Sequence, residues 1–500
     1  MQQLLFVLKK PQTVAAIFFV LLIAMLGNIG LQKAIPLRPQ SIHQWAQCDR
    51  ASVALNYALK RTTFFKPMVH ECSNGSGISG MELPVVNYGA SVLYQLFGYH
   101  EAYYRIWVML IAIAGIVAAY YLACLFLNQW WALAAVLLFI QSPVLLYYMP
   151  NFLPDAASLG LSLIAWWLFF KIIGQKSNTL LLWFFLIVSL AGLIKVTALI
   201  NTITMLLFVV IQNHKRGWRS LLTNNVLCAL VVSIIITGAW YIYARWLSVQ
   251  YHSYYFLMAP HYPTNLADAY KTWLRIKTGM LNEYYTAVLG YILLAGTIAL
   301  AFNFKKVQRQ LLFVTVTLYA GSFLFFMLML NQFVYHDYYF IALMPAVLFH
   351  LMLIANLVQK LNFKMQLGIA LIIVVAANYG MNICKKNFAS RYNEQSWYYN
   401  NAKSKAYFNF ETVLRENGIA SDEKILSFTD ETPNTSLYLM NQRGISLGAD
   451  TNLWHPYLKA GYKYAVLNDS LLLHSGLQAF LDKRLTYKFG LYLYTLKPQQ

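Results

Sequence analysis

Long apolar runs recur over the first 384 residues of the chain, and short polar segments separate them. A helix needs about 20 mostly apolar residues to cross the hydrocarbon core of a bilayer. The fifth and sixth runs are continuous, and we divide them at Lys195 because an unpaired ammonium group in mid-bilayer is costly. The pattern then predicts eleven spans, at residues 13–31, 102–126, 130–148, 156–173, 179–194, 196–212, 222–243, 285–302, 311–330, 338–358 and 366–384.

The pattern changes after residue 384, where short apolar stretches alternate with polar ones. It predicts strands at 424–428, 464–467 and 491–496, and helices at 408–416, 434–440 and 471–485. The predicted fold class is an all-α polytopic membrane protein with a small C-terminal α/β domain. We expect a transmembrane domain over 1–384, with long loops at 32–101 and 244–284, and the α/β domain over 385–500.

Composition agrees with this class. The chain is 59% hydrophobic and only 11% charged, with a mean hydropathy of +0.50, whereas soluble domains are about a quarter charged. The 38 Lys and Arg residues exceed the 18 Asp and Glu residues and give a net charge of +20. Basic cytoplasmic loops explain much of this excess, and no nucleic-acid-binding motif is present, so we expect no nucleic-acid partner.

The basic residues of the short loops predict the orientation, because such residues concentrate on the cytoplasmic side. One set of alternate loops carries them: Lys9, Lys10, Lys171, Lys176, Lys215, Arg216, Arg219, Lys305, Lys306, Arg309, Lys360 and Lys364. The opposite, outer face then receives 32–101, 149–155, the turn at Lys195, 244–284, 331–337 and everything after 384. We expect the first span to be an uncleaved anchor, since no small-residue cleavage site follows it.

The acidic residues lie mostly on this outer face, and very few fall near mid-bilayer. This placement argues against an ion or proton path of the transporter kind. In the first outer loop, apolar positions at helical spacing follow Asp49 and again follow Pro84, which predicts two interfacial helices. A purely structural interpretation is that Asp49 caps the first helix and that Glu82 favours the start of the second.

Two cysteines, Cys48 and Cys72, share the first outer loop. An oxidising compartment could join them, and two separate thiols are an equal alternative.

Several motifs together resemble a known family of membrane enzymes. They are residues 43–50 (HQWAQCDR), 82–88 (ELPVVNY), 150–155 (PNFLPD), 192–197 (GLIKVT), 336–339 (HDYY) and 433–441 (PNTSLYLMN). In their order and outer location they resemble GT-C fold glycosyltransferases, close to bacterial protein O-mannosyltransferases and lipid A aminoarabinose transferases. Arg50 is a departure, because protein O-mannosyltransferases typically have Asp-Glu there, which argues against a protein acceptor.

The resemblance implies an integral membrane glycosyltransferase in the bacterial inner membrane, with its active site and C-terminal domain in the periplasm. It would transfer a monosaccharide from a polyprenyl-phosphate donor to a hydroxyl of a glycolipid, glycan or protein acceptor. Such a reaction needs a base for the acceptor hydroxyl and cations or a metal ion for the departing lipid phosphate. The alternatives are a lipid or polysaccharide transporter, a non-catalytic envelope assembly protein and, among enzymes, an oligosaccharide ligase.

The resemblance also assigns roles to residues of this chain. Asp49 is expected to be the catalytic base, with Glu82 as a second acidic residue. Lys195 is the candidate for binding the donor phosphate, and Arg105 and Arg275, which are outer cations at span or loop edges, are further candidates. A divalent metal ion is a further candidate cofactor, with Glu82 and His336 as its candidate ligands. The remaining site candidates are His43, Arg50, Asp155, His336, Asp337 and Tyr338.

Overall fold

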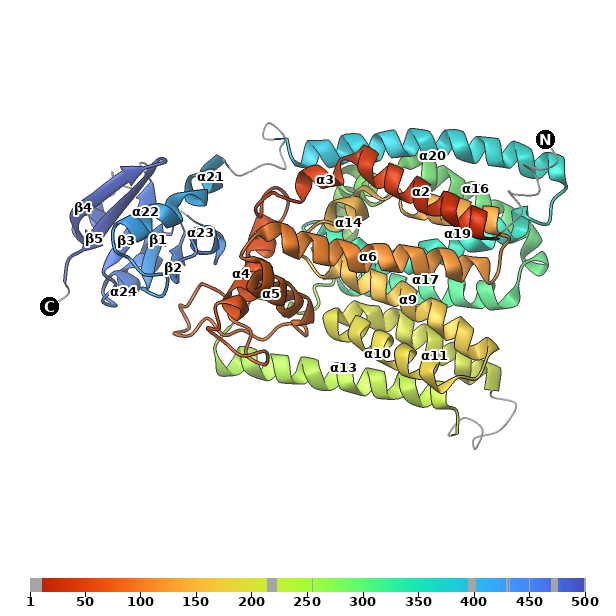
Figure 1. The fold of residues 1–500 in the computed structure, drawn as a ribbon, viewed down its shortest axis with the longest axis horizontal. Helices are drawn as coiled ribbons and strands as arrows, with labels where there is room; N and C mark the ends of the chain where they lie inside the picture. Colours follow the sequence, from red (N-terminus) through yellow and green to blue (C-terminus); the bar gives the residue numbers. More distant parts are fainter. Residues whose placement is uncertain are drawn as a thin grey trace. The chain divides into compact units, whose positions relative to one another are not determined.

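The structure, a computed structural model, describes residues 11–213, 223–253, 255–393, 402–428, 430, 432–448, 450–468 and 475–498. They form two compact units (Figure 1). Unit 1 comprises Met1–Ile35, Arg105–Tyr241 and Ala259–Ala389, and unit 2 comprises Pro36–Tyr104, Ile242–Met258 and Ser390–Gln500. The first outer loop, which the sequence assigned to the transmembrane domain, therefore packs within unit 2.

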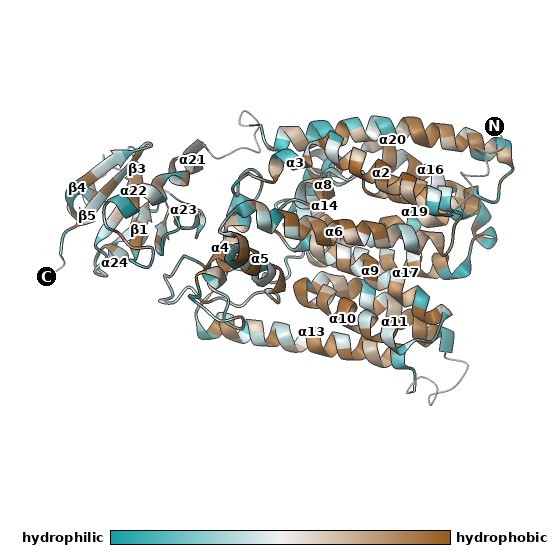
Figure 2. Cartoon of the chain, in the orientation of Figure 1, coloured by the Kyte–Doolittle hydropathy of each residue, from teal (hydrophilic) through white to brown (hydrophobic). Residues whose placement is uncertain are grey.

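Unit 1 is a bundle of apolar helices. Its long members run side by side in Figure 1 and are predominantly hydrophobic in Figure 2. The elements that lie wholly or mainly in this unit are α2 (Pro11–Ile29), α3 (Leu31–Ala34), α6 (Glu101–Cys124), α7 (Gln129–Phe139), α8 (Pro143–Tyr148), α9 (Asp155–Gly174), α10 (Asn178–Ile194), η1 (Val196–Ala198), α11 (Leu199–Asn213), α13 (Asn225–Gln250), α14 (Leu266–Gly279), α15 (Leu281–Tyr284), α16 (Ala287–Asn303), η3 (Phe304–Lys306), α17 (Arg309–Leu328), α18 (Leu330–Phe333), η4 (Asp337–Leu343), α19 (Met344–Val358) and α20 (Phe363–Arg391).

The predicted spans are largely confirmed. In the described part of the chain, nine helices are long and apolar enough to cross a membrane, and α7 and α10 are shorter apolar helices at the third and fifth predicted spans. The third span was predicted to be continuous over 130–148, and this is wrong. Helix α7 ends at Phe139 and α8 begins at Pro143, because Pro143 has no N–H group to continue a helix and Ser142 caps the new one.

Segments that the sequence assigns to the same side of the membrane lie together at each end of unit 1. At one end, loops predicted to be cytoplasmic bond to one another, including Asn128 N to Gln359 Oε1 (3.0 Å) and Gln308 N to Asn356 Oδ1 (3.2 Å). At the other end of α19, the end of the third predicted span meets a segment predicted to be outer, since Tyr148 donates to Asp337 Oδ1 (2.7 Å). Of the basic residues used for the prediction, Lys9, Lys10, Lys215, Arg216 and Arg219 lie outside the described residues.

Two glycines bring α6 and α9 into backbone contact. A Cβ atom on Gly115 would lie 2.2 Å from the Cα of Gly160, far closer than van der Waals contact. Only glycine at both positions allows this approach. The contact fixes α9, whose first residue is Asp155, against α6.

Unit 2 combines the first outer loop with the C-terminal segment. Its elements are α4 (Gln44–Ala58), α5 (Val85–Phe97), α21 (Ala402–Phe408), α22 (Phe410–Glu416), β1 (Ile425–Phe428), α23 (Thr435–Leu439), β2 (Gly444–Leu447), η5 (Thr451–Leu453), α24 (Trp454–Leu458), β3 (Tyr464–Asn468), α25 (Ser475–Gln478), β4 (Leu481–Lys488) and β5 (Leu491–Leu496). The strands form one sheet of order β2-β1-β3-β5-β4, in which β1 is parallel to β2 and β3, and β5 is antiparallel to β3 and β4.

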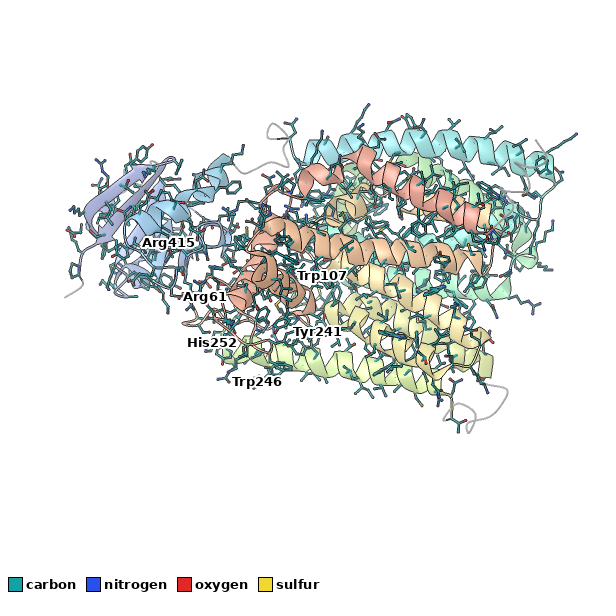
Figure 3. All side chains as sticks on the ribbon, in the orientation of Figure 1. Arg61, Trp107, Tyr241, Trp246, His252 and Arg415 are labelled. Carbon is teal, nitrogen blue, oxygen red and sulfur yellow. The ribbon has the colours of Figure 1, made fainter. Side chains whose placement is uncertain are left out.

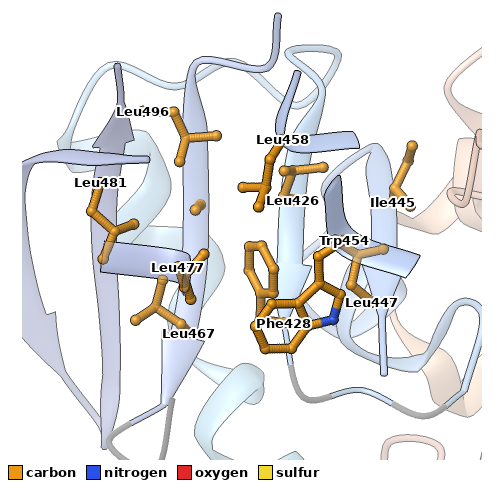
Figure 4. Packing of buried hydrophobic residues seen from close by; sticks show 11 residues of the cluster. Leu426, Phe428, Ile445, Leu447, Trp454, Leu458, Leu467, Leu477, Leu481 and Leu496 are labelled. Atoms are coloured by element: carbon orange, nitrogen blue, oxygen red, sulfur yellow. The ribbon is translucent and has the colours of Figure 1, made fainter. Parts of the chain in front are cut away.

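An apolar cluster holds this sheet to its short helices (Figure 4). Trp454 of α24 packs edge-on against Phe428 of β1, with ring centroids 5.0 Å apart. Burial of large side chains such as these is the main stabilising contribution in a small domain. The predicted α/β class of this segment is therefore confirmed.

The predicted elements of this segment are mostly correct, with one error. The three predicted strands are present as β1, β3 and β5, and the helices at 408–416 and 434–440 are present as α22 and α23. A helix over 471–485 is wrong. Its first residues lie outside the described residues, α25 is a single turn, and Leu481–Lys488 is strand β4.

Helix α4 differs from its prediction in two ways. It begins at Gln44, five residues before Asp49, after His43 in the left-handed conformation (φ 54°). The positions expected to face lipid, including Ala51, Ala54 and Leu55, are buried within the protein instead. Helix α5 matches its prediction better, since it ends at Phe97, directly before Gly98, and leaves Leu96 exposed.

Backbone and side-chain bonds join the first outer loop to the C-terminal segment. Cys72 N donates to Gly444 O (2.9 Å), and Gly444 N donates to His70 O (3.2 Å). Arg61, labelled in Figure 3, pairs with Asp422 (2.8 Å). The residues just after α4 are therefore fixed against strand β2 and the turn before β1.

Candidate active site

Asp49 lies inside helix α4 and is almost completely buried, with 2% of its surface exposed. The cap interpretation of Asp49 is therefore wrong, because a cap residue precedes the first turn of its helix. A carboxyl group buried in this way must be hydrogen-bonded, protonated or held ready for a ligand. The groups around the Asp49 carboxyl determine which of these three states it adopts.

The carboxyl group of Asp49 lies beside the side chain of Asn434, which favours the ionised carboxylate. Its Oδ1 has no hydrogen-bond donor among the described residues. Burial raises the pKa of Asp49 to about 7, although the neighbouring Arg50 and Asn434 lower it. Such a group exchanges protons near neutral pH, as a general base must.

Arg50, which follows Asp49 in the sequence, forms an ion pair with Glu82. Arg50 Nη2 lies 2.9 Å from Glu82 Oε1, and the Arg50 guanidinium stacks 4.7 Å above the ring of Phe256. Asn87 of α5 donates to Arg50 O (2.8 Å), which fixes α5 against α4. Glu82 lies before α5, whose N-terminal cap is Pro84, so its role is this ion pair rather than a helix start.

His43 lies at the start of α4 rather than inside it. It forms the N-terminal boundary of α4, and its ring lies edge-on to Trp45 with centroids 6.3 Å apart. It therefore determines where α4 begins.

Two residues near Asp49 were not predicted as site candidates. The Glu71 carboxylate accepts from Ser73 N (2.7 Å) and from the hydroxyl of Tyr255, and its charge raises the pKa of Asp49. His70 Nδ1 lies 2.6 Å from Ser52 Oγ, and burial lowers the pKa of His70 to about 3, so the ring is neutral. The scarcity of acids in this chain could have identified Glu71, whereas nothing in the sequence distinguishes His70.

Lys195 lies in unit 1, at the break between α10 and η1. Its backbone is extended (φ −152°, ψ 117°), and the next N–H group, of Val196, donates to the Tyr241 hydroxyl (2.9 Å; Tyr241 is labelled in Figure 3). The division of the long apolar run at Lys195 is therefore confirmed.

The Lys195 ammonium is held by Asp155 and by two aromatic rings. Its Nζ lies 3.1 Å from Asp155 Oδ1 and 3.3 Å from Oδ2, and it lies 5.5 Å from the ring centre of Tyr338 and 6.0 Å from that of Tyr339. The cation–π geometry and the ion pair both stabilise a charged lysine. Asp155 is the first residue of α9 and acts as an ion-pair partner rather than a cap.

A small polar pocket opens beside this ion pair. Asp155 and Lys195 line it together with Ser158, Ser162, Thr197 and Asn201. Hydroxyl and amide groups around a cation are the chemistry that binds phosphate oxygens.

His336, Asp337 and Tyr338 form a second polar group at the same end of unit 1. The Tyr148 hydroxyl donates to Asp337 Oδ1 (2.7 Å), and the Tyr338 hydroxyl lies 3.2 Å from His336 Nδ1. Because Tyr338 also faces Lys195, its ring joins the two groups. Both Tyr338 and Tyr339 are buried.

The other two predicted phosphate ligands have different positions. Arg105 is completely buried, donates to Pro150 O (2.6 Å) and stacks 4.5 Å above the ring of Phe152. It thus supports the segment that leads into Asp155. Arg275 is instead exposed on α14.

Neither a disulfide nor a metal cluster is present among the described residues. Cys48 and Cys72 are buried free thiols, which agrees with the alternative of two separate thiols. No group of three or more His, Cys, Asp and Glu side chains in the described part of the chain could hold a metal ion. Glu82 and His336 belong to different units.

Known proteins match both the sequence and the fold. Residues 82–243 match the family model described as dolichyl-phosphate-mannose-protein mannosyltransferase. No curated protein matches the sequence. Apo ArnT from Cupriavidus metallidurans matches with a TM-score of 0.60 at 13% identity, covering 96% of this chain and 97% of that one.

Two further crystal structures match over most of the chain. ArnT from the same organism bound to undecaprenyl phosphate gives a TM-score of 0.62 at 12% identity, covering 97% of this chain and 98% of that one. The Archaeoglobus fulgidus oligosaccharyltransferase in complex with Zn and sulfate gives 0.58 at 15% identity, covering 95% and 72%.

The chain therefore has the GT-C fold of membrane glycosyltransferases, and the resemblance noted in the sequence is confirmed. It is a multi-pass membrane protein similar in fold to ArnT over nearly its whole length.

Proposed function

We propose that this protein transfers a monosaccharide from a polyprenyl-phosphate donor to a hydroxyl group on the outer face of a bacterial inner membrane. The observation that carries the proposal is the buried Asp49 carboxyl group, with its open Oδ1 and a pKa of about 7. A group of this kind suits proton removal from a weak nucleophile.

The chemistry assigns one step to Asp49. The acceptor oxygen attacks the anomeric carbon of the donor sugar while Asp49 Oδ1 takes the hydroxyl proton. The bond between the anomeric carbon and the phosphate oxygen breaks, and its electron pair leaves with the polyprenyl phosphate. Attack opposite to the leaving group inverts the anomeric configuration.

Lys195 is the proposed ligand of the leaving phosphate. Its ammonium is charged, partly exposed and surrounded by polar side chains, so it can stabilise the developing negative charge. A polyprenyl-phosphate donor is supported by the undecaprenyl phosphate bound to the similar ArnT structure and by the dolichyl-phosphate-mannose family match. The outer location is supported by the basic residues at the opposite end of unit 1, among them Lys305, Lys306 and Lys360.

The test is sugar transfer by the purified protein in lipid nanodiscs. Donors carrying different monosaccharides on undecaprenyl phosphate are incubated with lipid, glycan and peptide acceptors, and mass spectrometry detects the product and donor hydrolysis. We expect transfer or hydrolysis of at least one donor by the wild type and none by Asp49→Asn. Asp422→Asn, an exposed carboxylate in the same unit, is the matched control and should retain activity. Lipid movement across the bilayer without a covalent product would favour the transporter instead.

A further inference from the structure

The side chain of Asn434 is completely buried at the start of α23 and contacts the first outer loop. Its Oδ1 accepts hydrogen bonds from His70 N (3.1 Å) and Glu71 N (3.0 Å). An amide oxygen accepts and an amide nitrogen donates, so these two N–H groups determine which way the amide points. Its Nδ2 is therefore fixed on the side away from residues 70 and 71.

The Nδ2 group of Asn434 is directed at helix α4. It lies 3.5 Å from Cys48 O, and the same amide faces the carboxyl group of Asp49, the next residue of α4. An ionised carboxylate can only accept, so Nδ2 is the donor. Oδ1 of Asp49 has no donor among the described residues, which leaves Oδ2 as the oxygen that Nδ2 can reach.

We propose that Asn434 is a positioning residue for Asp49, donating to one carboxylate oxygen so that the other stays directed at the acceptor hydroxyl. This inference rests on the function proposed above. A carboxylate without a donor at Oδ2 could rotate about its Cβ–Cγ bond and exchange its two oxygens. The bond from Nδ2, held by two backbone N–H groups, fixes this rotation.

The electrostatic consequence follows from the groups that face Asp49. Arg50 and the Asn434 side chain favour its ionised form, whereas burial and the charges of Asp430 and Glu71 disfavour it. The Cys48 thiol stays protonated, because burial raises its pKa well above the usual value. Loss of the Asn434 donor should therefore raise the pKa of Asp49, and the proton should stay on the carboxyl group to higher pH.

The neighbouring residue supplies a matched control. The Thr435 side chain lies beside the Cys48 thiol, so α23 packs against α4 at two adjacent positions. Thr435→Val removes one contact between the same two helices without touching Asp49. A purely structural role for Asn434 predicts similar effects of Asn434→Ala and Thr435→Val.

The experiment compares the pH dependence of kcat/KM for the wild type, Asn434→Ala and Thr435→Val in nanodiscs. In Asn434→Ala we expect the acidic limb to move to higher pH by about one unit, which is a loss of about tenfold in kcat/KM on that limb. In Thr435→Val the limb should stay in place. A loss in Asn434→Ala that is equal at all pH values would overturn the proposal.

A second measurement does not depend on enzymatic activity. A second variant, Asn434→Asp, keeps the test decisive if Asn434→Ala does not fold. Infrared difference spectra against Asp49→Asn follow the protonated carboxyl band of Asp49 directly. Asn434→Asp keeps the acceptor for the two backbone N–H groups, lacks the donor and adds a like charge. In Asn434→Asp, the two neighbouring carboxyl groups should repel each other when both are ionised. The protonated carboxyl band should therefore persist to higher pH than it does for Asp49 in the wild type. An unchanged Asp49 band would refute the inference, and a wild type without sugar transfer would refute only the proposed function.

Discussion

Lys195 and Asp155 form an ion pair of 3.1 Å although 39 residues lie between them, and both flank breaks at the same end of unit 1. Asp155 holds the lysine at the polar pocket through this ion pair. An incoming phosphate would meet a cation that is oriented and still able to bind a second anion. This relationship motivates the first prediction.

Replacement of Lys195 by methionine should lower kcat/KM for a polyprenyl-phosphate sugar by about 100-fold, because one fixed cation at a leaving group contributes on that scale. Steady-state kinetics with the purified variant provide the measurement. Arg275→Ala is the control, since Arg275 is exposed on α14 and should change the rate less than twofold. Comparable losses in both variants would contradict the assignment of Lys195.

The wild-type enzyme should show an acidic limb governed by Asp49. The pKa of Asp49 is raised to about 7, and only the ionised form accepts a proton. We expect kcat/KM to rise about tenfold per pH unit up to about pH 7 and then to level off. A rate that is flat between pH 5 and 8 would exclude a base of this pKa.

Arg50→Gln should move that limb to higher pH. The Arg50 guanidinium lowers the pKa of Asp49, so its removal should raise that pKa. Transfer at pH 7 should then fall and should recover at higher pH. The same substitution breaks the ion pair with Glu82, and the melting temperature should also fall. Arg61→Gln, which breaks the ion pair with Asp422 in the same unit, should leave the limb in place.

Asp49→Asn should be inactive yet more stable than the wild type at high pH. The folded-state pKa of Asp49 is raised above the value of an unfolded chain, so folding favours the protonated form. The contribution of Asp49 to stability is therefore fully present below about pH 4 and is lost as the pH rises through about 7. An uncharged asparagine avoids this loss, by a few kcal/mol at most.

Thermal unfolding at pH 5 and pH 8 measures this effect. The difference in melting temperature between Asp49→Asn and the wild type should increase with pH. A difference that is constant or decreases with pH would show that burial does not disfavour the Asp49 carboxylate.

The glycine contact between α6 and α9 predicts a packing defect. Gly115→Val places its side chain against the backbone of Gly160, so the helices must separate. We expect a destabilisation of about 1–3 kcal/mol, seen as a lower melting temperature and more aggregation on size-exclusion chromatography. Gly174→Ala at the end of α9 meets nothing within 4 Å and should behave like the wild type.

Much of the fold could be predicted from sequence, because membrane spans are determined by length and apolarity alone. The predicted element boundaries were wrong where a single residue ended or started a helix against the apolar pattern. The break before Pro143 interrupts an otherwise apolar run. The start of α4 was misplaced because Asp49 is a favoured cap residue, whereas His43, an uncommon residue in the left-handed conformation, takes that place.

The site was only partly predictable for a different reason. The sequence identified Asp49, Glu82, Asp155, Lys195 and Tyr338 as candidates, but their partners depend on packing between distant segments. Nothing local indicates that Glu82 pairs with Arg50 or that Tyr338 faces Lys195. The contact of Asn434 with Asp49 joins distant parts of the chain, and it requires the C-terminal segment to fold against the first loop.

The most direct test of the account is single-turnover transfer from a radiolabelled undecaprenyl-phosphate sugar by the wild type and by Asp49→Asn at saturating donor and acceptor. The account predicts a covalent product with inverted anomeric configuration from the wild type, and donor binding without product from Asp49→Asn. Equal product from both proteins would contradict the role of Asp49 as the base.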